Sequence, residues 1–164
     1  MKKIYAILMI ALFFAGCATD KEPHVKSSMF QSVSPQEATL TQTGKNKEFC
    51  VRCGMNLVKY YKTSHAAEDK KHNYQYCSIH CLEEHLGEGI TLKNPRVVDV
   101  DSLKLIPVGD AFYVVGSKVR GTMTRVSKYA FKAESMAKEF QAKNGGKIMR
   151  FNEALEVAKE DFKR

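Results

Sequence analysis

The sequence predicts an α+β fold in which two small ββαβ-like units pack together, the first of them with a treble-clef-like cysteine knuckle. Three observations support this prediction. The 164 residues suffice for one compact domain or two very small ones. Short β-rich stretches alternate with helical periods in both halves, and two closely spaced cysteine pairs lie in the first half. We expect one folded domain over residues 48–164, with its halves at about 48–101 and 108–164.

The N-terminal residues 1–16 predict a secretory signal peptide. Two lysines precede an apolar run from Ile4 to Phe14, which is too short to span a bilayer as a mature helix. The run ends at Phe-Ala-Gly-Cys, which resembles the lipobox of bacterial lipoproteins. That resemblance implies cleavage before Cys17, a diacylglycerol on its thiol and a fatty acyl chain such as palmitate on the new N-terminus. The alternative is an ordinary signal peptide with a leftover cysteine.

The lipobox resemblance has consequences for location. Ala18 rather than aspartate follows Cys17, so the inner-membrane retention signal of some lipoproteins is absent. We therefore expect a periplasmic protein, anchored by its lipid to the outer rather than the inner membrane, in an oxidising compartment. Residues 17–47 are polar and aperiodic, and they predict a flexible tether between the lipid and the domain.

The chain has a formal net charge of +8 at pH 7. Its lysines are scattered among acidic residues, no dense basic run is interleaved with aromatic residues, and tryptophan does not occur. This pattern favours a solvated basic surface, which can meet an acidic partner, over nucleic-acid binding.

Local patterns predict the elements of the first unit. β-branched and aromatic residues indicate short strands at 49–53, 57–61, 74–77 and 96–100. Ser78 is a candidate N-cap for a helix over 79–86, which Gly87 or Gly89 ends. We expect residues 62–73 to form a polar loop.

The second unit repeats this order. Strands are predicted at 111–115, 129–131 and 147–151, and helices at 133–143 and from a cap at Asn152 to Phe162. Each half also has a glycine-containing turn with a methionine, Met55 in the first and Met123 in the second. Because these positions correspond, facing units would bring both methionines to one site. The alternative is that one or both fill the core.

Four cysteines of the domain predict a metal site. Cys50 and Cys53 form a CxxC pair on a tight turn. Cys77 and Cys81 are spaced i and i+4, which places both sulfurs on one face at the start of the predicted helix, where thiolates are electrostatically favoured. A knuckle pair plus a helix-start pair is the ligand layout of treble-clef-like metal sites. With the thioether of Met55, the donor set is soft enough for monovalent copper.

Other chemistry fits the same cysteines. Two structural disulfides are the default in an oxidising compartment, and four thiolates satisfy the tetrahedral preference of zinc. Thiol–disulfide exchange is disfavoured because no long helix follows Cys53, and covalent haem is excluded because Gly54 occupies the place of the required histidine. We interpret four histidines of the domain as solvent-exposed residues rather than ligands: His65, His72, His80 and His85.

Short motifs follow one another along the chain in a recognisable order. After the lipobox they are Cys53-Gly54-Met55, Tyr113-Val114-Val115-Gly116-Ser117, Gly121-Thr122-Met123, Phe131, Asn144-Gly145-Gly146 and Phe151. This set resembles the NosL family of copper-binding lipoproteins, which are accessory to the maturation of nitrous oxide reductase. The resemblance covers roughly residues 49–156.

The resemblance implies that Cys53 and Met55 hold Cu(I), with Met123 as a third ligand. Two threonines flank Met123 where the family has proline and glycine, which is a departure from the pattern. Three further cysteines lie outside the minimal family pattern: Cys50, Cys77 and Cys81. The sequence leaves open whether they form a zinc-like site, enrich the copper site in thiolate or pair as a disulfide.

By resemblance, the expected function is that of a periplasmic, lipid-anchored metallochaperone and not of an enzyme. It would deliver Cu(I) to the nitrous oxide reductase apoprotein, together with other copper-assembly factors, for the copper–sulfide centre of that enzyme. The alternative is a zinc-stabilised treble-clef-like module for metal storage or protein interaction. The expected metal is thus Cu(I) or zinc.

Overall fold

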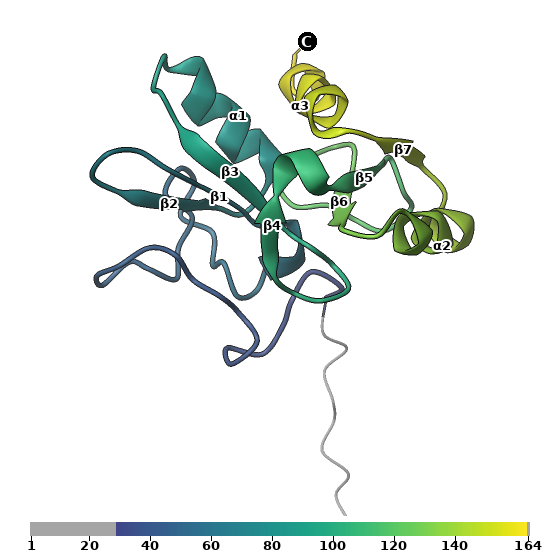
Figure 1. Ribbon diagram of the computed structural model, residues 1–164, viewed down its shortest axis with the longest axis horizontal. Coiled ribbons are helices and arrows are strands. Elements are labelled where there is room, and N and C mark those ends of the chain that lie inside the picture. The colour runs from purple at the N-terminus through teal and green to yellow at the C-terminus, as the bar shows by residue number, and fades with distance from the viewer. Residues whose placement is uncertain (1–28, 164) are drawn as a thin grey trace, which may run out of the picture.

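The computed structural model describes residues 29–163, which form two small antiparallel sheets with helices packed around them (Figure 1). The predicted signal peptide, Cys17 and the first part of the expected tether lie outside the described residues. No helix in the described part of the chain is both long enough and apolar enough to cross a membrane.

The first unit is a hairpin followed by a helix and two further strands. Its elements are β1 (His65–Glu68), β2 (Asn73–Tyr76), α1 (Ile79–Gly87), β3 (Lys93–Val98) and β4 (Leu105–Pro107). The strand order is β2-β1-β3-β4, and every neighbouring pair is antiparallel. A short 3-10 turn, η1 (Tyr61–Thr63), precedes β1, and a second, η2 (Val108–Asp110), leads into the next unit.

The second unit repeats the same connection. Its elements are β5 (Phe112–Val115), β6 (Lys128–Phe131), α2 (Glu134–Asn144), β7 (Lys147–Met149) and α3 (Phe151–Glu160). The strand order is β6-β5-β7, again antiparallel. In both units the strand that follows the helix returns to the first strand of the hairpin. Both halves therefore contain a ββαβ order, with β4 and α3 as additions, but the hairpin of the first half is not formed by the strands that the sequence predicts around Met55.

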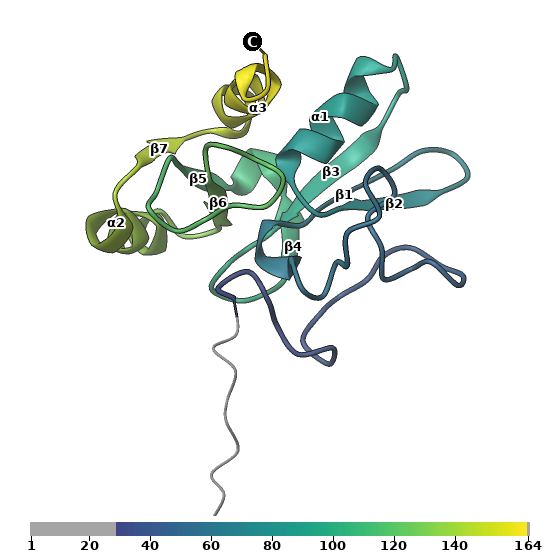
Figure 2. The ribbon, with the colours of Figure 1, turned by 180° about the vertical axis from the view of Figure 1, so that it is seen from behind.

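The two units share a core. Helices α1 and α3 pack against each other and lie side by side in both ribbon views (Figure 1 and Figure 2). One cluster of buried side chains combines Val97 and Ile106 of the first sheet with Tyr113 and Ala154 of the second unit. This burial holds the loops of the second unit in a fixed position relative to the first.

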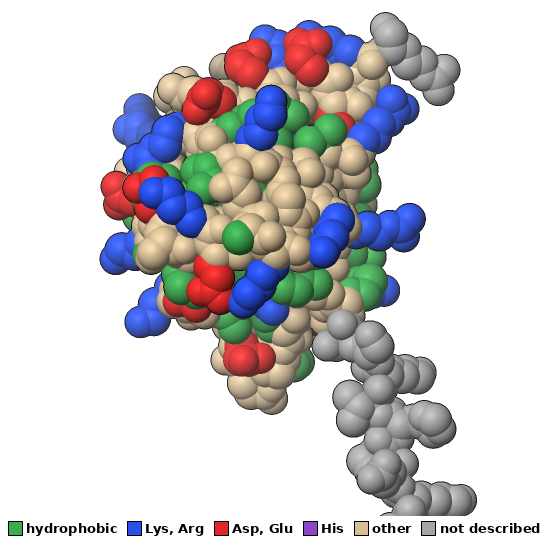
Figure 3. Space-filling view, turned by 90° about the vertical axis from the view of Figure 1, so that its right-hand side faces the viewer, with side chains coloured by type: hydrophobic (Ala, Val, Ile, Leu, Met, Phe, Trp, Pro, Cys, Tyr) green, Lys and Arg blue, Asp and Glu red, His purple; other side chains and the backbone are tan. Residues whose placement is uncertain are grey.

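The charged surface agrees with the solvated pattern that the sequence predicts. Lysine and arginine side chains are spread among acidic ones over the face shown in Figure 3. On α2, lysines pair with glutamates one turn away, Lys138 with Glu134 at 2.7 Å and Lys143 with Glu139 at 2.6 Å. Such exposed pairs contribute little to stability.

Two predicted strands are wrong. Residues 49–53 form a turn with a single bridge between Phe49 and Asn56, and residues 57–61 run through a turn into η1. At 57–61 the aromatic signal comes from a buried residue in a turn and not from a sheet. Tyr61 is fully buried, and its hydroxyl donates to the Leu103 carbonyl at 3.0 Å.

Two real strands were not predicted. Strand β1 lies within the expected polar loop 62–73, and its central residues are fully buried alanines, which lack the β-branched signal of a strand. Strand β4 is only three residues long and pairs with β3 at the edge of the sheet. A segment this short carries no periodicity of its own.

The helix starts show one confirmed cap and one wrong cap. Ser78 is the N-cap of α1, and its hydroxyl accepts from the Cys81 backbone N–H at 3.4 Å. The cap predicted at Asn152 is wrong, because α3 begins at Phe151 and its N-cap is Arg150, two residues earlier. There the Glu153 carboxylate accepts from the Arg150 backbone N–H at 2.8 Å, which is one half of a capping box.

The described end of the expected tether contacts the domain. The Thr39 N–H donates to the Tyr61 hydroxyl and the Thr41 N–H to the Gln75 side-chain oxygen, each at 2.9 Å. Gln31 is buried, and its side-chain amide donates to the Arg120 carbonyl. Residues 31–41 therefore belong to the folded domain, which begins before the predicted boundary at residue 48.

His65 lies in the core between the units, where the sequence analysis expected an exposed residue. Its side chain is fully enclosed, with Nδ1 3.1 Å from the Thr63 carbonyl and Nε2 3.2 Å from the Tyr113 hydroxyl. In the tautomer that satisfies both contacts, Nδ1–H donates to Thr63 and Nε2 accepts from Tyr113. Burial lowers the pKa of His65 from 6.5 to about 4.

This pKa predicts a loss of stability in mild acid. The unfolded chain binds a proton near pH 6.5 but the folded chain does not until about pH 4, so stability falls as the pH drops through this window. The expected loss is about 3 kcal/mol, measured by urea unfolding at a series of pH values. A His65→Gln variant should show a flatter profile over the same range. Equal profiles for the two proteins would contradict the assignment.

Candidate metal centre

Four cysteine sulfurs meet at one point of the first unit. The Sγ atoms of Cys50, Cys53, Cys77 and Cys81 all lie within 4.8 Å of one another. Three of the side chains are buried, whereas Cys53 is exposed. The structure thus joins the turn pair to the helix pair, as their spacing predicts. The treble-clef-like form of the knuckle stays a prediction.

The turn that carries Cys50 and Cys53 is held by backbone hydrogen bonds. The Cys50 N–H donates to the Met55 carbonyl at 2.8 Å, and the Gly54 N–H donates to the Cys50 carbonyl at 3.0 Å. Gly54 has φ +72°, a left-handed conformation that side chains disfavour. The Val51 N–H donates to the Gln75 carbonyl at 3.1 Å, which fixes the turn beside β2.

The second pair lies at the start of α1. Cys77 directly precedes the Ser78 cap, and Cys81 is in the first turn, so the cap bond to the Cys81 N–H orients both residues. The Thr63 hydroxyl lies 2.8 Å from the Cys77 carbonyl and donates to it. The Thr63 hydroxyl of η1 and the Ser78 cap of α1 thereby fix the backbone that carries Cys77 and Cys81.

The sulfur spacing fits a single metal ion. The Cys53 and Cys77 sulfurs are 3.4 Å apart, and the Cys77 and Cys81 sulfurs are 3.8 Å apart. A tetrahedral site with metal–sulfur bonds of about 2.3 Å would place its sulfurs roughly 3.8 Å from one another. All four cysteines are free thiols in the described chain, so the pairing into two disulfides that the sequence allowed is not found.

A fifth sulfur lies beside the cluster. The Met55 Sδ is 3.9 Å from the Cys77 Sγ, and the side chain packs into the same apolar cluster as Cys50 and Cys81. The sequence predicts Met55 and Cys53 as a soft donor pair, and the structure brings both into one group of sulfurs. Thiolate and thioether together favour soft ions such as Cu(I).

The thiols influence one another's ionisation. Hydrogen bonds from Cys77 and Cys81 lower the pKa of Cys50, because its thiolate accepts from both. The Cys77 thiol donates one of these hydrogen bonds. That bond to Cys50, a hydrogen bond with Cys81 and burial raise the pKa of Cys77. One thiolate is therefore favoured while its neighbours keep their protons. A metal ion that binds several of these sulfurs must displace those protons, so binding is stronger at higher pH.

Met123 lies outside the group of sulfurs in contact. Its side chain is 38% exposed, on the loop of residues 116–127 between β5 and β6, which we call the β5–β6 loop. The neighbouring Thr122 is buried, and its hydroxyl is 2.8 Å from the Thr63 hydroxyl, which donates to Cys77. The loop thus reaches the backbone beside the cluster.

The proposed correspondence of the two methionines is wrong. Met55 precedes β1, whereas Met123 lies inside the β5–β6 hairpin. The element equivalent to that hairpin in the first unit is the β1–β2 turn at residues 69–72. The sequence predicts a match only because it places strands at 49–53 and 57–61, on either side of Met55. These two strands do not exist.

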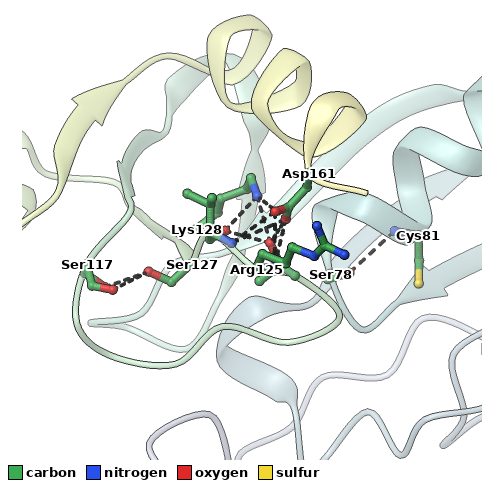
Figure 4. A network of polar contacts seen from close by, with 9 residues as sticks. Ser78, Cys81, Ser117, Arg125, Ser127, Lys128 and Asp161 are labelled. Carbon is green, nitrogen blue, oxygen red and sulfur yellow. Dashed lines mark hydrogen bonds and ion pairs between the residues drawn. The ribbon is translucent and has the colours of Figure 1, made fainter. Parts of the chain in front are cut away.

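The conformation of the β5–β6 loop is fixed by a buried ion pair (Figure 4). The Lys128 Nζ is 3.1 Å from an Asp161 oxygen, and both side chains are almost fully enclosed. The Asp161 carboxylate also accepts from the Arg125 and Val126 N–H groups at 3.1 Å and from the Thr124 hydroxyl. Sequence reasoning missed this network because its partners are more than thirty residues apart.

The four histidines differ in how far their side chains are buried. His85 is buried, with Nδ1 2.7 Å from the Tyr76 hydroxyl, and His65 is buried as described above, so the predicted solvent exposure is wrong for both. His72 is exposed, and the His80 ring packs on the Phe162 ring with centroids 4.6 Å apart. The sulfur cluster is built from cysteines and one methionine of the described chain.

Comparisons with known proteins find one family and a similar solved structure. The family model described as NosL matches residues 41–158. The crystal structure of the copper chaperone NosL from Shewanella denitrificans superposes with a TM-score of 0.54 at 23% sequence identity, covering 70% of this chain and 96% of that chain. At this identity the superposition shows a shared fold. A search of curated proteins gives no match.

The buried ion pair makes a prediction about the loop beside the cluster. Asp161→Asn leaves the Lys128 ammonium buried without a counter-charge, so we expect a loss of roughly 3–5 kcal/mol in urea unfolding. The matched control is Glu160→Gln, which breaks the exposed pair with Lys163 and should cost less than about 1 kcal/mol. Similar losses in the two variants would show that burial of the pair contributes nothing.

Proposed function

This chain belongs to the NosL family, and we propose that it is a copper chaperone that binds one Cu(I) ion at the sulfur cluster and transfers it to an acceptor protein. The observation that supports this most directly is the group of four cysteine sulfurs with the Met55 thioether at its edge. A zinc-binding protein has no need of that thioether, whereas Cu(I) accepts it readily.

The difference in exposure between the cysteines suggests how transfer proceeds. Cys50, Cys77 and Cys81 are buried and would retain the ion, whereas Cys53 is exposed and can be displaced by a ligand of the acceptor. Exchange of one ligand at a time keeps the ion coordinated throughout. In this proposal the chain binds and transfers its cargo and catalyses no reaction.

Met123 is a proposed additional ligand. Family resemblance implies it, and its exposed side chain lies on the loop whose Thr122 contacts Thr63 beside Cys77. We propose that it meets the ion during loading or release rather than in the resting cluster. The proposed acceptor is the nitrous oxide reductase apoprotein, with other copper-assembly factors, and this part of the proposal rests on the family alone.

A four-thiolate zinc site is the second candidate. The separations of 3.4 and 3.8 Å between cysteine sulfurs are close to those of a tetrahedral site, and this observation favours it specifically. The protein would then be a zinc-stabilised module for metal storage or protein interaction. The two candidates differ in what Met55 does, because a complete set of four thiolates leaves no place for a thioether.

Metal competition separates the candidates. Cys53→Ser and Met55→Leu should each weaken Cu(I) binding by about tenfold or more, measured under reducing conditions against a chelator of known affinity. Met136→Leu, on α2 away from the cluster, is the control and should bind normally. Retention of one zinc that is lost only when the cysteines are removed, with no Cu(I) affinity, would refute the chaperone and establish the zinc module.

The lipid anchor makes a separate prediction. We propose that Cys17 carries the lipid and holds the protein at the periplasmic face of a membrane, in the outer rather than the inner membrane. Cys17→Ala should then leave the protein either soluble in the periplasm or uncleaved, as seen by fractionation and by the mass of the N-terminus. A processed Cys17→Ala protein that stays in the membrane would contradict lipidation.

A further inference from the structure

A basic hollow lies on the β5–β6 loop. It has a volume of about 470 Å³ and is lined by the exposed cations Lys118, Arg120 and Arg125, with Ser117, Thr124 and Ser127 between them. Its lining contains no acidic residue. A hollow with this lining suits carboxylate groups, because its three cations offer positive charge and N–H donors.

The three cations lack acidic partners. Within residues 29–163 none of them forms an ion pair, whereas the lysines of α2 pair with glutamates on their own helix. Arg125 instead packs its guanidinium over the Phe162 ring, 5.5 Å from the centroid. The loop therefore presents positive charge that the surrounding surface does not neutralise.

The hollow is preorganised. The Asp161 carboxylate fixes residues 124–126, and the Ser117 and Ser127 hydroxyls are hydrogen-bonded at 2.9 Å across the base of the loop. A Cβ atom at Gly121 would lie only 2.9 Å from the Ser127 Cα. The two sides of the loop at Gly121 and Ser127 are therefore so close that only glycine fits there. A surface that is already ordered loses little entropy when a partner binds.

The same loop adjoins the sulfur cluster on two sides. Thr122 contacts Thr63, which donates to the Cys77 carbonyl. On the other side the Phe162 ring, on which Arg125 packs, contacts the ring of His80, the residue before Cys81. The loop that bears the hollow and Met123 therefore contacts, through Thr63 and His80, the segments that carry Cys77 and Cys81.

We propose that the β5–β6 loop is the docking surface for the metal acceptor, and that a carboxylate-rich patch of that acceptor occupies the basic hollow. This inference rests on the proposed function and adds the chemistry of the partner surface. Charges of this kind act mainly on the rate of encounter and make it sensitive to salt. Metal affinity itself should not depend on them.

The first test measures Cu(I) transfer to nitrous oxide reductase apoprotein. Lys118→Glu combined with Arg120→Glu should slow transfer by about tenfold at low salt, with the difference disappearing as salt is raised, and should leave Cu(I) affinity unchanged. The matched control is Lys70→Glu combined with Lys71→Glu, two exposed lysines on the equivalent β1–β2 turn, which should transfer normally.

The second test needs no copper. A short polyglutamate peptide, added to isotope-labelled protein at low salt, should shift the amide resonances of residues 117–127 and not those of the β1–β2 turn. The shifts should be absent in the Lys118→Glu, Arg120→Glu protein. No shifts in the loop, or saturation of the hollow by inorganic phosphate without any response to the peptide, would overturn the docking surface.

The outcomes separate the two proposals. If the wild-type protein transfers Cu(I) and both double variants transfer it at the same rate, with the same salt dependence, the docking surface is overturned. The chaperone function is then intact. A wild-type protein that binds no Cu(I) would overturn the chaperone function, and the transfer role of the loop with it. Peptide shifts confined to the loop would even then support a docking site for a carboxylate-rich partner.

Discussion

The candidate site depends on one constraint, which is that four cysteine sulfurs must be held within 4.8 Å of one another while one of them stays accessible. The turn that supplies Cys50 and Cys53 is fixed by the left-handed Gly54 and by the hydrogen bond from Val51 to the edge of β2. The helix that supplies the other pair is fixed by its Ser78 cap. Both supports belong to the hairpin and helix of one ββαβ unit, so the rest of that unit orients the sulfurs.

The second unit has the same order of hairpin, helix and returning strand, but it contributes no cysteine to the cluster. Its hairpin carries the long β5–β6 loop where the first unit has a short turn, and this loop lies against the first unit beside the cysteines. One unit thus supplies the sulfurs, and the other supplies a loop that contacts the first unit through Thr63. Packing of α1 on α3 holds the two units together, and the buried pair of Lys128 and Asp161 fixes the loop within the second unit.

Burial of polar groups is the cost of this arrangement. A histidine, a lysine and an aspartate lie in the interior, each satisfied by hydrogen bonds that come from distant parts of the chain. Such groups destabilise a protein when a partner is removed, because the one left behind stays buried and unpaired. They also admit few alternative packings, which suits a loop that must stay beside the cysteines.

Much of this protein could be predicted from local sequence. Gly54 and the i, i+4 cysteines indicated a turn and a helix start with converging thiols, and Ser78 was identified as the cap, because these features depend on residues within one turn of each other. The ββαβ order of the second unit follows from its alternating strand and helix patterns. The predicted strands 49–53 and 57–61 are wrong because residues with strand propensity, such as the buried Tyr61, also occur in turns.

By itself, then, the sequence determined the cysteine pairs, their soft chemistry and the mixed strand and helix content of the two units. Only the tertiary structure decided that the pairs share one site with Met55, that Met123 lies on a neighbouring loop outside the sulfur contacts, and that His65 is buried. The reason is that these relations join residues far apart in the chain. Their distances depend on how two hydrophobic faces pack, which short-range patterns do not encode.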